Sequence, residues 1–153
     1  HDILAYIQPV FVDLDMNTVE PAIGAHRMEG IYAWKSMLDL GIHASGGSDA
    51  PVDSFDAMEN IYFAVTRKNI YGEPKDGWIP SERLSVDEAV KLFTKDAAYA
   101  SYTEDESGTI EIGKNADFVI LEKDIYRIDP DEIKTTKVDM TILGGRTVYE
   151  RIM

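Results

Sequence analysis

The chain has 153 residues, of which 44% are hydrophobic and 28% charged, a profile typical of a folded soluble domain. Fifteen Lys and Arg stand against 28 Asp and Glu, and the net charge of −13 argues against nucleic acid or membrane partners. The absence of cysteine excludes disulfides and thiolate metal sites, and it agrees with a cytoplasmic location.

The first part of the chain alternates between strand-like and helix-like patterns. The run 3–12 is apolar and rich in β-forming residues, which predicts a buried strand. Apolar residues at helical spacing predict a helix over 28–40, ended by Gly41, and "GIHAS" predicts a second strand. A strand–helix–strand order implies that the two strands pair in parallel within one sheet.

Two more helices are predicted before residue 103. Asp53 can cap the first, which carries apolar side chains at helical spacing over 55–65. The second, over 85–102, opens with a capping box formed by Ser85 and Glu88.

From about residue 104 the pattern changes to short β-runs. "GTIEIGKNADFVILEKD" has two such runs around a Gly-Lys-Asn turn. "KVDMTILGGRTVYE" has two more around Gly144-Gly145, which is a two-residue hairpin signal. We therefore predict two units: residues 1–104 with α/β elements, and residues 105–153 as a small antiparallel β-unit.

The stretch "HASGGSDAPV" places Asp49 directly after a predicted parallel strand. In α/β architectures, ligands and catalytic groups gather at the carboxyl ends of such strands. Gly46 and Gly47 permit backbone torsions and a close approach that a side chain would block. A plainer interpretation is that Asp49 caps the next helix or makes an Asx-turn, since Asp is common in turns. The pattern alone leaves both alternatives open.

Several segments closely resemble the carboxyl-terminal part of the amidohydrolase superfamily: "GSDAPV", "FTKDAAYAS", "ESGTIEIGKNADFVIL" and "TILGGRTVY". The segments "ILAYIQP" and "HRMEGIYAWKSMLDLGI" resemble the amidohydrolase family 3 branch, which includes formamide deformylases and proteins once labelled exoenzyme regulators. The resemblance covers essentially the whole chain. It implies an α/β fold that is the carboxyl-terminal slice of a (β/α)₈ barrel, followed by part of a small β-sandwich.

The resemblance also implies a metal-dependent hydrolase of non-peptide carbon–nitrogen bonds. In this family the acid after the eighth strand binds a divalent metal and transfers protons, and Asp49 occupies its place. A bound Zn²⁺ lowers the pKa of its water to about 7, and a nearby carboxylate can accept the released proton. The expected roles of Asp49 are therefore metal ligand and catalytic proton shuttle, with zinc as the metal and a small amide-type molecule as the substrate.

The other metal ligands of the family are absent from this sequence. It has only His1, His26 and His43, without a His-x-His pair, and His43 precedes Asp49 by roughly 20 Å of extended strand. One carboxylate cannot hold zinc, because a catalytic site normally takes about three protein ligands. We therefore expect the chain to be the last quarter to third of a longer enzyme, inactive alone and prone to self-association. A short stand-alone protein with a flavodoxin-like sheet is the alternative.

Four other residues are candidate substrate contacts, each with a plainer alternative. Gln8 could donate a hydrogen bond to substrate or satisfy loop backbone. Arg27 could clamp an anionic or carbonyl group, or form a surface ion pair. Ser48 could bind a ligand or hold the Asp49 loop, and His26 could touch substrate or be solvated. The alternative function is a non-catalytic ligand-binding or assembly module in which Asp49 is a helix cap.

Overall fold

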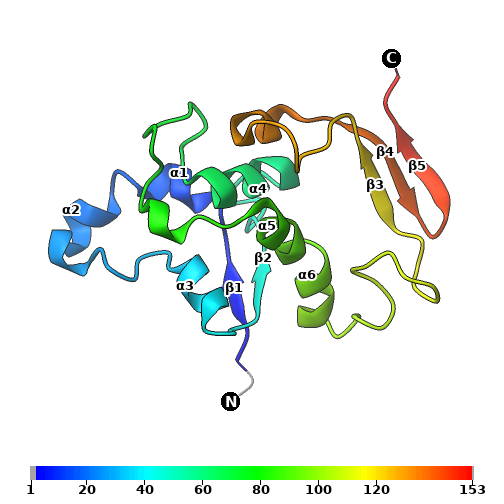
Figure 1. Cartoon of the computed structure of the whole chain (residues 1–153), viewed down its shortest axis with the longest axis horizontal. Coiled ribbons are helices and arrows are strands. Elements are labelled where there is room, and N and C mark those ends of the chain that lie inside the picture. Colours follow the sequence, from blue (N-terminus) through cyan, green and yellow to red (C-terminus); the bar gives the residue numbers. More distant parts are fainter. Residues whose placement is uncertain (1–2, 153) are drawn as a thin grey trace.

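The computed structural model of the chain describes residues 3–152. Its long axis runs from the segment around α2 at one end to an antiparallel sheet at the other (Figure 1). In chain order the elements are β1 (Ala5–Ile7), α1 (Phe11–Asp15), α2 (Val19–Ile23), η1 (Ala25–Arg27), α3 (Trp34–Asp39), β2 (Ala44–Gly46), α4 (Ala57–Thr66), η2 (Pro80–Glu82), α5 (Val86–Leu92), α6 (Lys95–Ala100), β3 (Phe118–Leu121), η3 (Pro130–Thr135), β4 (Val138–Leu143) and β5 (Arg146–Glu150). Within residues 3–152, no helix has the length and apolar character needed to cross a membrane.

The predicted parallel pairing of the first two strands is confirmed. Ala5 of β1 lies opposite Ala44 of β2, and Ile7 lies opposite Gly46. The Gly47 amide then donates to the Ile7 carbonyl at 2.9 Å, so the pairing continues one bond past β2. Both strands therefore end at the same edge of the pair.

The prediction of a single strand over 3–12 is wrong in its second half. Pro9 has no amide hydrogen to donate to a strand ladder, and the chain turns into α1 two residues later. The Val10 amide donates instead to Oδ1 of Asn60 in α4, at 3.1 Å. Val12 is fully buried within α1, so the apolar run reflects burial rather than continuous strand.

The helix predicted over 28–40 is confined to α3. Gly30 and Tyr32 both have φ in the left-handed region, at 84° and 49°, which keeps the preceding residues in turns.

The helix predicted over 85–102 is present as two pieces, α5 and α6, separated at Thr94 by non-helical torsions (φ −130°, ψ −93°). Its predicted capping box is confirmed, with both reciprocal hydrogen bonds between Ser85 and Glu88.

The core is built around α4, which is buried on almost every side. All of its residues from Met58 to Thr66 are buried except the half-buried Glu59. Ile125 and Ile133 belong to the same apolar cluster as α4, and Ile133 is fully buried within η3. Residues from both predicted units, 1–104 and 105–153, therefore contribute to one core, and the boundary between the units stays a prediction.

A buried cation lies at the end of α4. Arg67 is 0% exposed, and its Nε and Nη1 donate to the carbonyls of Trp78 (3.0 Å) and Tyr32 (3.1 Å). Its guanidinium carbon lies 4.6 Å from the ring centroid of Trp34 and 5.3 Å from that of Trp78. Desolvation lowers the pKa of Arg67 to about 10, an effect that the negative charge of Glu82 opposes. Arg67 thus holds two loops to the end of α4.

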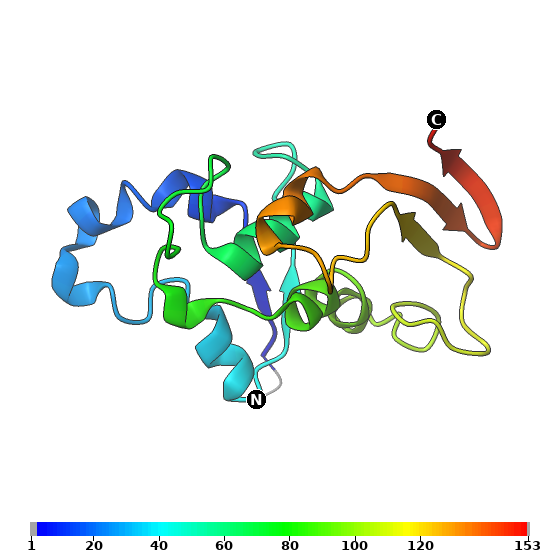
Figure 2. The same ribbon diagram turned by 45° about the horizontal axis from the view of Figure 1, so that its top comes forward.

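The predicted hairpin around Gly144-Gly145 is confirmed. Both glycines have positive φ, at 56° and 76°, as a tight turn between the antiparallel strands β4 and β5 requires. β3 pairs with β4 on the other side, which gives the sheet order β3–β4–β5. This sheet is set apart from the helices in both views (Figures 1 and 2).

The first β-run of the predicted β-unit, around "TIEI", is not a strand. Ile110 and Ile112 are exposed, and no strand pairing of this run occurs within residues 3–152. The sheet itself also leaves apolar side chains exposed, namely those of Phe118, Val119, Ile120, Leu143, Val148 and Tyr149.

We expect Arg67→Met to destabilise the chain by about 2 kcal/mol, because two carbonyls at the edge of the core lose their donor. The matched control is Arg127→Met, since Arg127 is exposed and, within the described part of the chain, its side chain pairs only with Asp124, three residues away. Urea unfolding should give a clearly lower midpoint for the first variant and little change for the second. Equal midpoints would contradict a stabilising role for the buried cation.

We also expect the chain to self-associate through its uncovered sheet. Free strand edges and exposed apolar side chains favour pairing with another sheet. Sedimentation velocity should show a concentration-dependent shift to larger species, and Val148→Lys in β5 should weaken it. A chain that stays monomeric at high concentration would count against this expectation.

Candidate functional site

Gln8, Ser48 and Asp49 lie at the carboxyl edge of the β1–β2 pair. Gln8 directly follows β1, and Ser48 and Asp49 follow β2 by two and three residues. Because Ile7 is paired with Gly46, the loops that carry these residues leave the sheet side by side. Gln8 and Ser48 are half-buried, whereas Asp49 is exposed. The structure therefore brings three of the five predicted site residues to one edge.

The backbone of Asp49 has φ of 56°, in the left-handed region that Asp adopts more readily than most residues. Its carbonyl accepts a hydrogen bond from the Val52 amide at 2.8 Å, which closes a turn. The neighbouring acids are used locally: Asp53 accepts from the Ser54 amide at 2.6 Å. Among residues 3–152, no hydrogen bond or ion pair engages the Asp49 carboxylate. The turn therefore presents this carboxylate to solvent at the edge of the strand pair.

The helix-cap interpretation of Asp49 is wrong, and so is the prediction that Asp53 caps the helix. α4 begins at Ala57, and its N-cap is Asp56, whose Oδ1 accepts from the Met58 amide at 2.8 Å. The helix begins later than its apolar pattern suggests because Phe55, the first apolar residue of that pattern, is 87% exposed and lies outside it. The carboxylate of Asp49 is thus not needed to start α4.

The two glycines before Asp49 have different surroundings. A Cβ at Gly46 would lie 2.7 Å from Cζ of Phe93, so β2 is packed directly against this ring. A Cβ at Gly47 would meet nothing within 4 Å. The lack of a side chain at Gly46 therefore makes room for the Phe93 ring and not for a ligand.

His26 and Arg27 lie elsewhere in the fold. Both are exposed on η1, and the His26 ring is folded back beside Gly24, where a Cβ would lie 3.1 Å from it. In both ribbon views α2 and the segment after it extend away from the β1–β2 pair (Figures 1 and 2). Their roles as substrate contacts stay predictions.

His43 lies at the opposite end of β2 from Asp49. Its carbonyl accepts from the Ala5 amide at 2.9 Å, and its ring stacks on Tyr99 with centroids 4.7 Å apart. His43 thus packs on α6, away from Asp49. His1 lies outside the described residues.

Two acids after β1, Asp13 and Asp15, accept hydrogen bonds that connect loops. Oδ1 of Asp13 accepts from the Ile70 amide at 2.8 Å, and Asp15 accepts from the Tyr32 hydroxyl. Burial, together with the nearby Asp15 carboxylate, raises the pKa of Tyr32. These acids fasten loops to one another, and the spacing of the two residues in the sequence gave no signal of that role.

The described residues do not complete a metal site. Within 3–152 there is no group of three or more His, Cys, Asp or Glu side chains that could hold an ion. Since a catalytic zinc takes about three protein ligands, Asp49 amounts to a single donor.

A family profile described as "Amidohydrolase family" matches residues 3–149. YtcJ of Bacillus subtilis (strain 168), a protein named as an amidohydrolase, is 37% identical over 95% of this chain and 27% of its own length. The N-substituted formamide deformylase of Arthrobacter pascens is 33% identical over 79% of this chain and 22% of the enzyme. The crystal structure of an uncharacterized metal-dependent hydrolase from Pyrococcus furiosus superposes with a TM-score of 0.66 at 25% identity, over 82% of this chain and 25% of that one. The chain thus spans about a quarter of the length of these relatives.

We expect the two acids that flank the loop 49–56 to differ in their effect on stability. Asp56→Ala should lower the free energy of unfolding by about 1 kcal/mol, because α4 loses its N-cap. Asp49→Asn should leave it nearly unchanged, because Asn also tolerates positive φ and no cap is lost. Urea denaturation of both variants checks this difference, and a larger loss at Asp49 would restore a structural role for its carboxylate.

Proposed function

Since this chain belongs to the amidohydrolase family, we propose that it is the carboxyl-terminal part of a hydrolase of non-peptide carbon–nitrogen bonds. The observation that carries the proposal is the position of Asp49, whose carboxylate has no partner among residues 3–152 and lies at the carboxyl edge of a parallel strand pair. In barrels of parallel strands, catalytic groups come from this edge.

In this proposal β1 and β2 are the seventh and eighth strands of a (β/α)₈ barrel, and β3–β5 are part of a small β-sandwich. The parallel register of β1 with β2 supports the first assignment. The exposed apolar side chains of β3 and β5 support the second, because a facing sheet would cover them. A barrel of this kind typically needs about 250 residues, so the rest of it would come from polypeptide beyond this chain.

We propose that the complete protein binds a divalent metal, with zinc the expected ion, and that Asp49 supplies one carboxylate ligand. When bound, such an ion acts as a Lewis acid toward a carbonyl oxygen and toward water. The described residues hold one suitable donor, so the remaining ligands would lie outside this chain.

The Asp49 carboxylate is then suited to move protons. It would accept one proton from the attacking water as the water oxygen bonds to the substrate carbonyl carbon. The carbon–nitrogen bond breaks, and Asp49 passes the proton to the departing nitrogen, which leaves as an amine. Gln8 and Ser48 lie at the same edge, and in this proposal each side chain hydrogen-bonds to substrate. Arg27 and His26 enter the proposal as substrate contacts made from η1.

The substrate class to test first is the N-substituted formamides, because one relative carries that name. Free formate and an amine would be the products.

The location proposed for the enzyme is the cytoplasm. The chain alone is expected to be inactive, because it lacks the other metal ligands.

In the complete protein, we expect Asp49→Asn to lower kcat by about 10²–10⁴-fold, because the proton acceptor is lost. The matched control is Asp53→Asn, which makes the same change four residues away in the same loop, where the carboxylate accepts from the Ser54 amide. Deformylation of a panel of N-substituted formamides would be followed by release of formate, with metal content measured in parallel. Full activity of Asp49→Asn, or an equal loss at Asp53, would overturn the assignment.

A further inference from the structure

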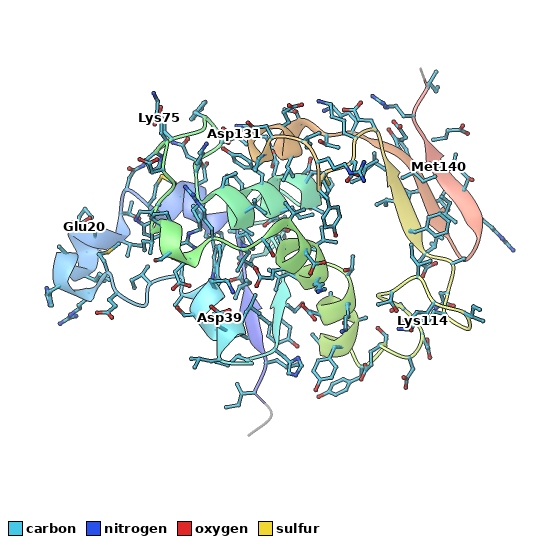
Figure 3. All side chains as sticks on the ribbon, viewed as in Figure 1. Glu20, Asp39, Lys75, Lys114, Asp131 and Met140 are labelled. Carbon is cyan, nitrogen blue, oxygen red and sulfur yellow. The ribbon has the colours of Figure 1, made fainter. Side chains whose placement is uncertain are left out.

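A small cleft of about 280 Å³ lies between the end of α1 and the loop that follows α4. Lys75 marks this loop in Figure 3, where it stands at the side of the molecule that carries α1 and α2. The lining residues are Met16, Asn17, Asn69, Glu73, Pro74 and Trp78. The volume is close to the lower end of the range for ligand sites and suits a small molecule.

The loop wall of this cleft is held in shape by its own hydrogen bonds. Oδ1 of Asn69 accepts from the amides of Tyr71 (3.0 Å) and Glu73 (2.9 Å), and the Asn69 amide donates to the Glu73 carbonyl at 2.6 Å. The Tyr62 hydroxyl, from the core, donates to the Asn69 carbonyl at 2.8 Å. A ligand would therefore meet a preformed wall and would not have to order it.

The indole of Trp78 is equally fixed. The backbone amide of Trp78 donates to the Arg67 carbonyl at 2.6 Å, and the Trp78 carbonyl accepts from Nε of Arg67. The centroid of the Trp78 ring lies 5.5 Å from that of the Tyr32 ring. Arg67 already places a positive charge 5.3 Å from the indole centroid. The ring is thus a rigid apolar surface, and selection of a charged ligand has to come from another group.

Glu73 supplies that charge. Its side chain is exposed, and among residues 3–152 the Glu73 carboxylate makes no hydrogen bond or ion pair. The side-chain amide of Asn17 is likewise unengaged within the described part of the chain. The cleft therefore offers a negative charge, a free amide, an indole and the thioether of Met16.

We propose that this cleft binds a small primary ammonium ion that carries a short apolar substituent. The ammonium group would pair with Glu73 and donate to the Asn17 carbonyl oxygen, and the substituent would lie against Trp78 and Met16. Anions are disfavoured by Glu73 and by the net charge of −13. The proposal rests on the cleft alone and is independent of the hydrolase function.

The test is a titration of the chain with butylammonium chloride at neutral pH, followed by tryptophan fluorescence. The chain has two tryptophans, and Trp34 is only 3% exposed, so a ligand in the cleft reports mainly through Trp78. We expect a saturable change with butylammonium, and at least a fivefold weaker response with the neutral isostere butanol and with sodium chloride. A response to butanol equal to that of butylammonium would overturn the proposal.

Two variants with the same change of charge make the assignment specific. Glu73→Gln should weaken butylammonium binding at least fivefold, because the counter-charge is lost. Glu20→Gln changes the net charge equally on α2, outside the cleft lining, and should leave binding unchanged (Figure 3). Equal weakening by both variants would show a general electrostatic effect, and the proposal would then fail. An unsaturable response of the unmodified chain would have the same consequence.

Discussion

The parallel pairing of β1 with β2 is the constraint on which the position of Asp49 depends. Because both strands run in the same direction with Ile7 opposite Gly46, the residues that follow them emerge at one edge. An antiparallel pairing would put Gln8 and Asp49 at opposite ends of the strands. A Cβ at position 46 would lie 2.7 Å from Cζ of Phe93, so this ring, at the end of α5, packs directly on β2.

Two cations bind loop carbonyls and so tie distant loops to the core. Arg67 bonds to the carbonyls of Tyr32 and Trp78, so the segments before α3 and after α4 are tied to the same buried group. Lys134 of η3 also binds a loop carbonyl. Its ammonium lies 4.4 Å from the Tyr62 ring centroid and donates to the Ile70 carbonyl at 2.7 Å. These contacts join distant parts of the chain, which explains how a piece with short strands has one continuous core.

The sequence predicted those features that depend on local chemistry. The capping box at Ser85, the Gly144-Gly145 turn and the strand–helix–strand order each depend on a few neighbouring residues, and all three were found. The length of β1 and the start of α4 were mispredicted, because an apolar run reports burial without saying whether the buried segment is strand or helix. Nothing in the sequence distinguishes the buried Arg67 from a surface arginine, since its partners are backbone carbonyls brought in by the fold. In the same way, the residues around Asp49 predicted its place at a strand end. Only the structure shows that Asp56, and not Asp49, is the N-cap of α4.

We propose that the Asp49 carboxylate completes a coordination sphere whose other ligands come from polypeptide beyond this chain. A crystal structure of the complete protein, grown with a divalent metal and refined against anomalous data, tests this directly. We predict a carboxylate oxygen of Asp49 at about 2.0–2.2 Å from the ion, with the other ligands drawn from upstream strands. A metal bound without Asp49, or an Asp49 carboxylate hydrogen-bonded to backbone amides and remote from any ion, would contradict the claim.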